Sequence, residues 1–472
     1  MFYFTRSHMI DLMIDFAKLI FIPRKWRPDI VRVSTLPNGV RVATRRTLLD
    51  PTTNIIALVG AGSRDEVVGD YPRGVAHFFE HMFFRGSYKL TQGEEKFTSG
   101  EVEQKIHMLG GTISAATAPD KTRYMVSVPT KGVAQALSCL SSIVCRPTLA
   151  EAETESERLI ILTEWLETQM SVDDTQNWRM WQTAYGNSPL MQSPLGTEKT
   201  ILSIQRQDLL DFHRAKYWGG NTVVVVEGPV NHDAIVSQLK KEFTLPSGNK
   251  EAVSFPSYSG GYYASPEGGR GVRVKLGFNG SGQDSPDVQA TYSMLADILA
   301  GGKDSILYRT LRSKQSLVYN VSCDNSSALR LLDISFNTFA ENVKPCLEII
   351  SSTLNDLMVG VDLELIQRKK AAASLAYRIS STHSKRGVYD MAHFLLMEGK
   401  VPPRDYDTRR YLSVTPEAIQ ASIGRMLEKP PTLVVAGNTS HVPAYEDVCQ
   451  MFSAANRPAS AATVPSLGNT PR

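Results

Sequence analysis

The chain has 472 residues, more than one hydrophobic core usually supports, so the sequence predicts at least two domains. Hydrophobic residues make up 42% and charged residues 21% of the chain, which is ordinary for a soluble globular protein. The net charge of +3 is too small to imply a nucleic-acid-binding or membrane-binding surface. The 5 widely spaced cysteines argue against a disulfide scaffold and favour a reducing compartment.

Residues 1–30 are predicted to form an N-terminal amphipathic extension. Residues 9–21 are apolar apart from Asp11, Asp15 and Lys18, and a basic stretch follows at 24–27. The segment is too short and too charged to span a membrane, so no transmembrane segment is expected there. Two aspartates and the lack of a small-residue cleavage site argue against a transit or signal peptide. The main interpretation is a helix packed on the first domain; docking to a partner chain or a lipid surface is the alternative.

Residues 31–245 are predicted to form the first domain, with alternating strand and helix patterns. The strands are expected at 31–36, 40–44, 54–59, 112–117, 122–128 and 223–228. The helices are expected at 74–86, 101–109, 132–144, 148–170 and 206–217. A polar stretch at 92–99 is predicted to be a surface loop.

Residues 246–271 are rich in Gly, Ser, Pro and Tyr without a period, and are predicted to be a linker. The pattern of elements then begins again. Strands are expected at 272–276, 318–323, 331–336 and 433–437, and helices at 287–299, 343–358, 363–378 and 415–427. This order predicts a duplicated domain over 272–455, followed by a disordered tail over 456–472.

The predicted helix at 74–86 contains the motif His77-x-x-Glu80-His81, whose three residues fall on one stripe. Two imidazoles one turn apart can bind one metal ion, and a carboxylate between them reaches a metal-bound water. The alternative is a pair of core histidines beside a paired glutamate. A buried apolar helix cannot cheaply hide three titratable groups without a cation, which favours the metal site.

The second half offers an internal comparison for this motif. Aligning the two predicted helices places Ser293, Ala296 and Asp297 at the three motif positions. The second half therefore keeps the scaffold and lacks the ligands, which predicts one active and one inert half.

Zinc held by two histidines needs a third protein ligand before its open catalytic position. The candidates lie in the acidic helix: Glu151, Glu153, Glu155, Glu157, Glu164 and Glu167. Glu157 and Glu164 share a face, but so does Glu153, and periodicity alone does not choose between them. A solvated acidic face is the alternative.

In combination, several motifs resemble the pitrilysin family of inverted zincins, which includes insulin-degrading enzyme and the mitochondrial processing peptidase. The resemblance covers nearly the whole chain from 31 to 437 and is carried by residues 74–82, 157–164, 194–197, 311–312 and 318–319. It implies that Glu164 is the third zinc ligand and that Glu157 supports the metal ligands from outside. The gap from His81 to Glu164 is longer than is typical, and an insertion at 92–99 accounts for the excess.

The resemblance implies an α+β fold of two tandem duplicated α/β domains. Each would have a mixed, antiparallel-rich sheet with helices on one face, and the two would close as a clamshell around a chamber. Substrate is expected to add as a strand to the edge strand at 112–116, at Ser114 and Ala115. Ser114 stands where the family usually has asparagine. From the inactive half, Arg312 and Tyr319 are expected to contact substrate across the chamber; a surface arginine and a core tyrosine are the alternative.

The predicted function is a zinc-dependent endopeptidase with one zinc ion per chain and Glu80 as the general base. It would hydrolyse unfolded peptides or leader-type segments. The alternatives are a non-catalytic, processing-peptidase-like structural subunit, or an active subunit that requires an inert sister chain. The expected partners are a peptide substrate and either a second copy or a related inactive chain, without nucleic acid. A bacterial-type cytoplasm is the expected location, with the mitochondrial matrix as the alternative.

Overall fold

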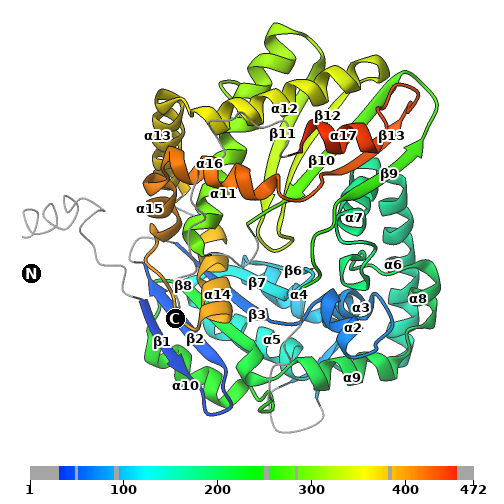
Figure 1. Cartoon of the computed structure of the whole chain (residues 1–472). Coiled ribbons are helices and arrows are strands. Elements are labelled where there is room, and N and C mark those ends of the chain that lie inside the picture. The colour runs from blue at the N-terminus through cyan, green and yellow to red at the C-terminus, as the bar shows by residue number, and fades with distance from the viewer. Residues whose placement is uncertain are drawn as a thin grey trace, which may run out of the picture.

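The computed structural model describes residues 31–47, 51–89, 95–248, 255–281, 285–380 and 385–453. The N-terminal extension and the C-terminal tail lie outside the described residues. Two α/β units are stacked one above the other, with the first half of the chain below and the second above (Figure 1). The predicted α+β class with two tandem mixed sheets is confirmed. Among the described helices, none combines the length and hydrophobicity that crossing a bilayer requires.

The first sheet has six strands in the order β1-β2-β8-β3-β7-β6, in which only the β2–β8 pair is parallel. Its strands are β1 (Val31–Thr35), β2 (Arg41–Arg46), β3 (Thr52–Val59), β6 (Thr112–Thr117), β7 (Thr122–Pro129) and β8 (Thr222–Gly228). The apolar run of β8 is buried on both faces, as in strands covered on two sides. Strand β6 lies at the edge.

The helices of the first half follow the predicted pattern with several additions. They are α2 (Ser63–Val68), α3 (Val75–Met82), α4 (Glu101–Met108), α5 (Val133–Cys145), α6 (Glu151–Met170), α7 (Val172–Ala184), α8 (Glu198–Ser203), α9 (Arg206–Lys216) and α10 (His232–Glu242). The sequence analysis missed α2, α7, α8 and α10. The described part of the expected loop at 92–99 is also partly strand, because β5 (Lys96–Phe97) pairs with β4 (Ser87–Tyr88).

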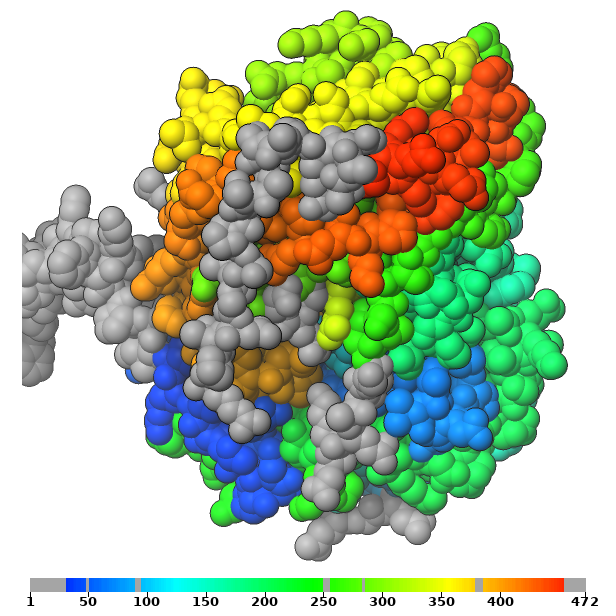
Figure 2. Space-filling model, in the orientation of Figure 1, coloured from blue at the N-terminus to red at the C-terminus, as the bar shows by residue number. Residues whose placement is uncertain are grey.

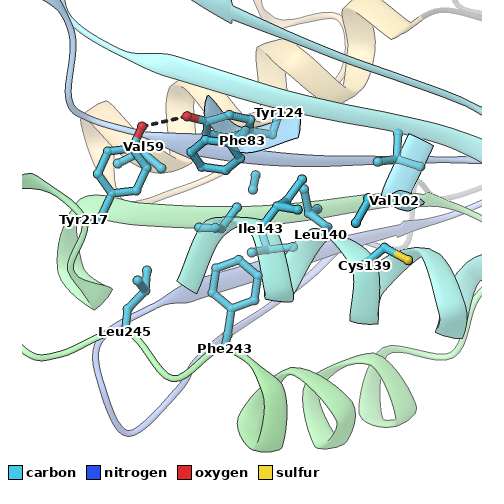
Figure 3. Close-up of a cluster of buried hydrophobic side chains, with 14 of the residues drawn as sticks. Val59, Phe83, Val102, Tyr124, Cys139, Leu140, Ile143, Tyr217, Phe243 and Leu245 are labelled. Atoms are coloured by element: carbon cyan, nitrogen blue, oxygen red, sulfur yellow. Dashed lines mark hydrogen bonds between the residues drawn. The ribbon is translucent and has the colours of Figure 1, made fainter. Parts of the chain in front are cut away.

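The core of the first unit lies between its sheet and these helices (Figure 3). Phe83, just beyond α3, stacks on Tyr124 of β7 with ring centroids 3.9 Å apart. The Tyr124 hydroxyl in turn forms a 2.7 Å hydrogen bond with the hydroxyl of Tyr217. Burying aromatic rings against the sheet stabilises the unit, and the paired hydroxyls satisfy each other. This packing fixes the end of α3 against the sheet.

The second sheet has five strands in the order β11-β12-β10-β13-β9, with β9 and β13 parallel. They are β9 (Gly261–Pro266), β10 (Gly271–Asn279), β11 (Val318–Ser326), β12 (Leu331–Phe339) and β13 (Thr432–Gly437). Read from the other edge, this order repeats β2-β8-β3-β7-β6, so β9 is the counterpart of β2. The segment predicted as a linker therefore contains a strand. Its polar, Gly-rich sequence carries no period, and pairing with β13 decides its conformation.

The helices of the second half are α11 (Pro286–Ala300), α12 (Val343–Val359), α13 (Leu363–Ser380), α14 (Lys385–Glu398), α15 (Tyr406–Ser413), α16 (Pro416–Met426) and α17 (Tyr445–Met451). The sequence analysis missed α14, α15 and α17. Each of these helices has a counterpart at the same place in the first half, and α14 corresponds to α7.

These two corresponding helices are exchanged between the units. Helix α14 leaves the second half and packs on the first sheet, where Val388, Met391 and Leu395 join the buried side chains Ile56 and Val225. Figure 1 shows α14 lying over β8 and β3, and in Figure 2 its gold atoms sit above the blue atoms of the first strands. Each sheet thus receives a helix on its second face, which the sequence analysis did not predict.

Helix α7 makes the reciprocal crossing. Its Met180 and Ala184 pack with Leu331 and Val434 of the second sheet. Beyond its end, the Tyr185 hydroxyl donates a hydrogen bond to the carbonyl of Leu329 at 2.5 Å. The exchange buries apolar surface from both halves together, which stabilises the contact between the two units.

Candidate metal centre

The buried carboxylate of Glu66 accepts hydrogen bonds from the backbone at the start of helix α3. Gly74 precedes the helix with a φ of 95°, and its amide and that of Ala76 donate to Glu66 of α2 at 3.1 and 3.0 Å. Glu66 thereby satisfies amides that the start of a helix leaves without an intrahelical partner. Burial raises the pKa of Glu66 to about 8.

The motif at 194–197 packs on the start of this helix. A Cβ on Gly74 would lie 2.6 Å from the Leu195 carbonyl oxygen, and one on Gly196 would lie 2.4 Å from that of Arg73. Both positions have positive φ as well. Glycine is therefore required at each position for the backbones to approach this closely.

His77, His81 and Glu164 form one group of donor atoms. One atom from each lies within 4.8 Å of the others. His77 Nε2 is 3.7 Å from Glu164 Oε1, and His81 Nε2 is 3.2 Å from Glu164 Oε2. Ligands around a tetrahedral zinc ion lie about 3.3 Å apart, so these spacings fit a zinc ion.

Glu157 contacts His81 but does not belong to the group of three donor atoms. The Nδ1–H of His81 donates to Glu157 Oε1 at 2.8 Å, which leaves His81 Nε2 directed at Glu164. The guanidinium of Arg85 donates to the other carboxylate oxygen of Glu157. An outer carboxylate of this kind fixes the tautomer and orientation of a metal-binding imidazole.

The protonation of the two histidines fits a cation site. Burial, followed by the nearby His81, lowers the pKa of His77 to about 4, which keeps this imidazole neutral as a metal ligand must be. Burial acts to lower the pKa of His81 as well, but hydrogen bonds to Glu157 and Glu164 raise it to about 9. Positive charge is therefore favoured between these two carboxylates.

Glu80 lies beside the three donor atoms without belonging to the group. Its side chain is buried, and burial raises its pKa, while the hydrogen bond from Thr117 lowers it. The Thr117 hydroxyl donates to Glu80 Oε2 at 2.9 Å from the end of β6. A carboxylate held in this way can take and return a proton next to a metal ion.

The edge strand β6 runs up to this site. Ser114 and Ala115 pair with Met125 and Tyr124 of β7 on one side. In the described part of the chain, no strand pairs with the other side of β6. A peptide can add there as an extra strand.

Arg312 and Tyr319 contact each other in the second unit. Arg312 lies in a π-helical segment (Tyr308–Lys314); its guanidinium donates to the Tyr319 carbonyl oxygen and lies 4.5 Å from the Tyr319 ring centroid. Tyr319 is 80% exposed, so the alternative of a core tyrosine is wrong. Within the described residues, no hydrogen bond, ion pair or ring contact joins either residue to the three metal-type ligands.

The sequence analysis missed four residues around the centre: Glu66, Arg85, Thr117 and Glu103. Arg85 follows His81 by four residues, so helical spacing was an available signal. The others come from separate elements, and no local pattern connects them with the motif.

Comparisons with known proteins identify families that match the two halves of the chain. Residues 41–198 match the family model described as Insulinase (Peptidase family M16), and residues 203–373 match the one described as Peptidase M16 inactive domain. An "uncharacterized zinc protease" of Rickettsia felis is 30% identical over 296 residues, which cover 62% of this chain and 70% of the relative.

The chain belongs to peptidase family M16. The predicted resemblance to pitrilysin-family zinc metallopeptidases is thereby confirmed.

Other M16 relatives are matched over different lengths. A "probable mitochondrial-processing peptidase subunit beta" of Arabidopsis thaliana is 34% identical over 223 residues, or 47% of this chain and 40% of the relative. The match thus spans less than half of that relative. A Pseudomonas fluorescens structure described as a peptidase M16 inactive domain superposes with a TM-score of 0.77 at 20% identity, covering 88% of this chain and 100% of that one. This likeness shows the M16 fold.

Proposed function

We propose that this M16 chain is a zinc-dependent endopeptidase that binds one zinc ion through His77, His81 and Glu164. The observation that carries the proposal is the group of three donor atoms within 4.8 Å of one another, with Glu80 beside it and outside the ligand set. Names of relatives support zinc as the metal.

The chain's own residues divide the work of hydrolysis. A zinc ion at this centre would supply Lewis acidity to the carbonyl of the scissile peptide bond. Glu80 removes a proton from the attacking water as the new C–O bond forms. The same carboxylate then delivers this proton to the amide nitrogen as the C–N bond breaks. Glu157, neutralised by Arg85, keeps the His81 ring in place.

The substrates in this proposal are unfolded peptides or leader-type segments. The exposed edge of β6 supports this, because an extended peptide pairs with Ser114 and Ala115 through its main chain. Arg312 and Tyr319 of the inactive half contact the substrate across the chamber. The proposed organisation is a catalytic domain over 31–245, a connecting segment over 246–271 and an inactive domain over 272–455, closing as a clamshell.

A related proposal is an active subunit that works with a second chain. The Arabidopsis relative is named as a subunit, which supports a homodimer or a heterodimer with a related inactive chain. A purely structural subunit is less well supported, because loss of function would allow the ligands to erode and all three stand together here. The bacterial and mitochondrial relatives support the bacterial cytoplasm and the mitochondrial matrix as the two locations.

Three measurements on the purified full chain test this proposal. Elemental analysis should find about one zinc ion per chain. The chain should cleave a quenched peptide library, and a chelator should stop this cleavage. Size measurement with and without candidate partner chains distinguishes an enzyme active by itself from one that needs a partner. Stoichiometric zinc without cleavage in any assembly would support the structural subunit instead.

A further inference from the structure

Glu80, the proposed base, is held from outside its own helix by Thr117 at the end of β6. The Thr117 hydroxyl donates to Glu80 Oε2 at 2.9 Å, and the Glu80 side chain is buried. A glutamate side chain can adopt many rotamers, so a fixed donor determines which way its carboxylate faces. The orientation of Glu80 beside the metal-type ligands therefore depends on the place of Thr117.

The turn that follows Thr117 joins β6 to β7. The Ala118 amide donates to the carbonyl of Lys121 at 2.8 Å, which closes the turn. At the start of α2, the amide of Arg64 donates to the carbonyl of Pro119 at 2.9 Å. These bonds make the turn a compact unit, so a contact at Lys121 also fixes Thr117 at its other end.

Lys121 connects this turn to α14, which comes from the second half of the chain and lies on the first sheet (Figure 1). Its side chain is buried, and Nζ donates to His393 Nδ1 at 3.3 Å and to Asp120 Oδ2 at 3.1 Å. Burial, followed by the charge of Lys121, lowers the pKa of His393 to about 4. The imidazole is therefore neutral, and its Nδ1 accepts the hydrogen bond from the lysine.

A second segment of the inactive half contacts the same region through Arg64. The buried Arg64 guanidinium donates from Nη2 to the carbonyl of Ala328 at 2.9 Å, in the turn between β11 and β12. Arg64 thus binds the β6–β7 turn through its backbone and the second half through its side chain. Helix α14 and the β11–β12 turn therefore both contribute to holding the segment that carries Thr117.

We propose that the second half of the chain orients the general base through the β6–β7 turn. The contact between Lys121 and His393 fixes the turn, and the turn holds Thr117 against the base. These three are positioning residues, because they act through Glu80 and need no contact with substrate. The inference rests on the proposed peptidase function and adds a role for α14 that is separate from direct contact between the inactive half and substrate.

Steady-state kinetics of the zinc-loaded full chain test the role of Thr117. Thr117→Val removes the hydroxyl and keeps the shape of the side chain, and kcat should fall by about 10–100-fold, as for a lost hydrogen bond to a charged group. KM and zinc content should stay at wild-type values, and Thr117→Ser should recover most of the activity. In a Glu80→Gln background, Thr117→Val should lower the remaining activity no further. Thr353→Val, which removes a buried hydroxyl from α12, is the matched control and should behave as wild type.

Substitutions at the contact between the two halves test the part of α14. Lys121→Met keeps the apolar stem and His393→Phe keeps the ring, and each should lower kcat by about 2–10-fold without changing KM. His393→Asn places an acceptor oxygen near the position of Nδ1 and should restore kcat. Neither loss should add to that of Thr117→Val. Lys370→Met removes a lysine contact to the Val414 carbonyl inside the second half, and this control should behave as wild type.

Crystal structures of the same variants separate this inference from the proposed activity. The Glu80 carboxylate should occupy one position in wild type and several in Thr117→Val and Lys121→Met. A Glu80 side chain that stays in place in both variants, or wild-type kcat in Lys121→Met and His393→Phe, would overturn the inference and leave the peptidase proposal standing. Absence of cleavage in every assembly, with Glu80 displaced in the variants, would overturn the peptidase proposal and leave the orienting contact standing.

Discussion

The two halves of this M16 chain share one strand order. In each half an ion pair joins a long helix to the segment that follows a buried helix, but the acidic and basic residues have exchanged places. In the first half, Glu157 is the seventh residue of α6 and pairs with Arg85 beyond α3. In the second half, Lys369 is the seventh residue of α13 and pairs with Asp304 beyond α11 at 2.6 Å. Both residues are buried, with 3% and 5% exposure. An ion pair between these helices is therefore part of the scaffold, with or without metal ligands.

The two halves have different residues at the positions of the metal-type ligands. Ala376 is the fourteenth residue of α13, as Glu164 is of α6. Asp297, opposite His81, accepts a 2.5 Å hydrogen bond from the Tyr411 hydroxyl. The second half thus fills the equivalent space with protein contacts. The comparison teaches that one strand order and helix arrangement can carry the three metal-type donors in one half and lack them in the other.

The largest expected effect tests whether one glutamate separates the two halves. The second half has Ala296 at the position of Glu80. Glu80→Gln should lower kcat by about 10²–10⁴-fold, because proton transfer is lost while the three metal ligands remain. Elemental analysis should find wild-type zinc content in the same preparation. Peptide hydrolysis near the wild-type rate would remove Glu80 from the role of base.

A second prediction asks whether the half without ligands takes part in catalysis. Arg312→Ala and Tyr319→Phe should each lower kcat/KM by about 10²–10³-fold, the effect of removing a donor from a developing oxyanion. Zinc content and the thermal midpoint should stay near wild-type values, because Tyr319 is exposed. Unchanged kinetics in both variants would show that the second half only encloses the site.

A third prediction sharpens the difference between Glu157 and Glu164. Glu164→Gln should lower zinc occupancy markedly, because it removes a charged ligand. Glu157→Gln should lower activity by about 10–100-fold with less loss of zinc, as expected for a residue that orients His81. Zinc titration against a chelator measures both. Loss of zinc only in Glu157→Gln would reverse the two assignments.

The smallest effect concerns how the corresponding helices begin. Helix α11 starts with Ser285, whose hydroxyl accepts from the Val288 amide, whereas α3 depends on buried Glu66. The folded pKa of Glu66 is about 8, above its ordinary value of 4.5. Between these values the folded state holds a proton that the unfolded state releases, so the stability from this group falls as pH rises.

The thermal midpoint of wild type, compared with that of Glu66→Gln, should therefore decline between pH 5.5 and pH 8. The change should be about 2–4 °C for each kcal/mol lost. Calorimetry with a chelator present measures it without a contribution from zinc. Glu151→Gln should show no such pH-dependent difference, and a parallel pH dependence in wild type and Glu66→Gln would contradict the prediction.

The sequence by itself determined those helices and strands whose buried residues recur at a regular local spacing. The continuous valines of β8 and the stripe of α3 identified a strand and a metal-type helix, because side-chain direction repeats every two or 3.6 residues. The repeated order of elements likewise indicated a duplicated fold. The same period could not separate Glu164 from Glu153, because both lie on the expected face of α6.

Only the tertiary structure decided which distant elements meet. Glu164 reaches the histidines, Thr117 reaches Glu80, and Glu66 caps α3 across separations that no local pattern records. Helices α7 and α14 escaped prediction for the same reason, since each buries its apolar residues against the sheet of the other half. A local period tells which face of an element is buried, whereas its partner is set by packing between segments far apart in the chain.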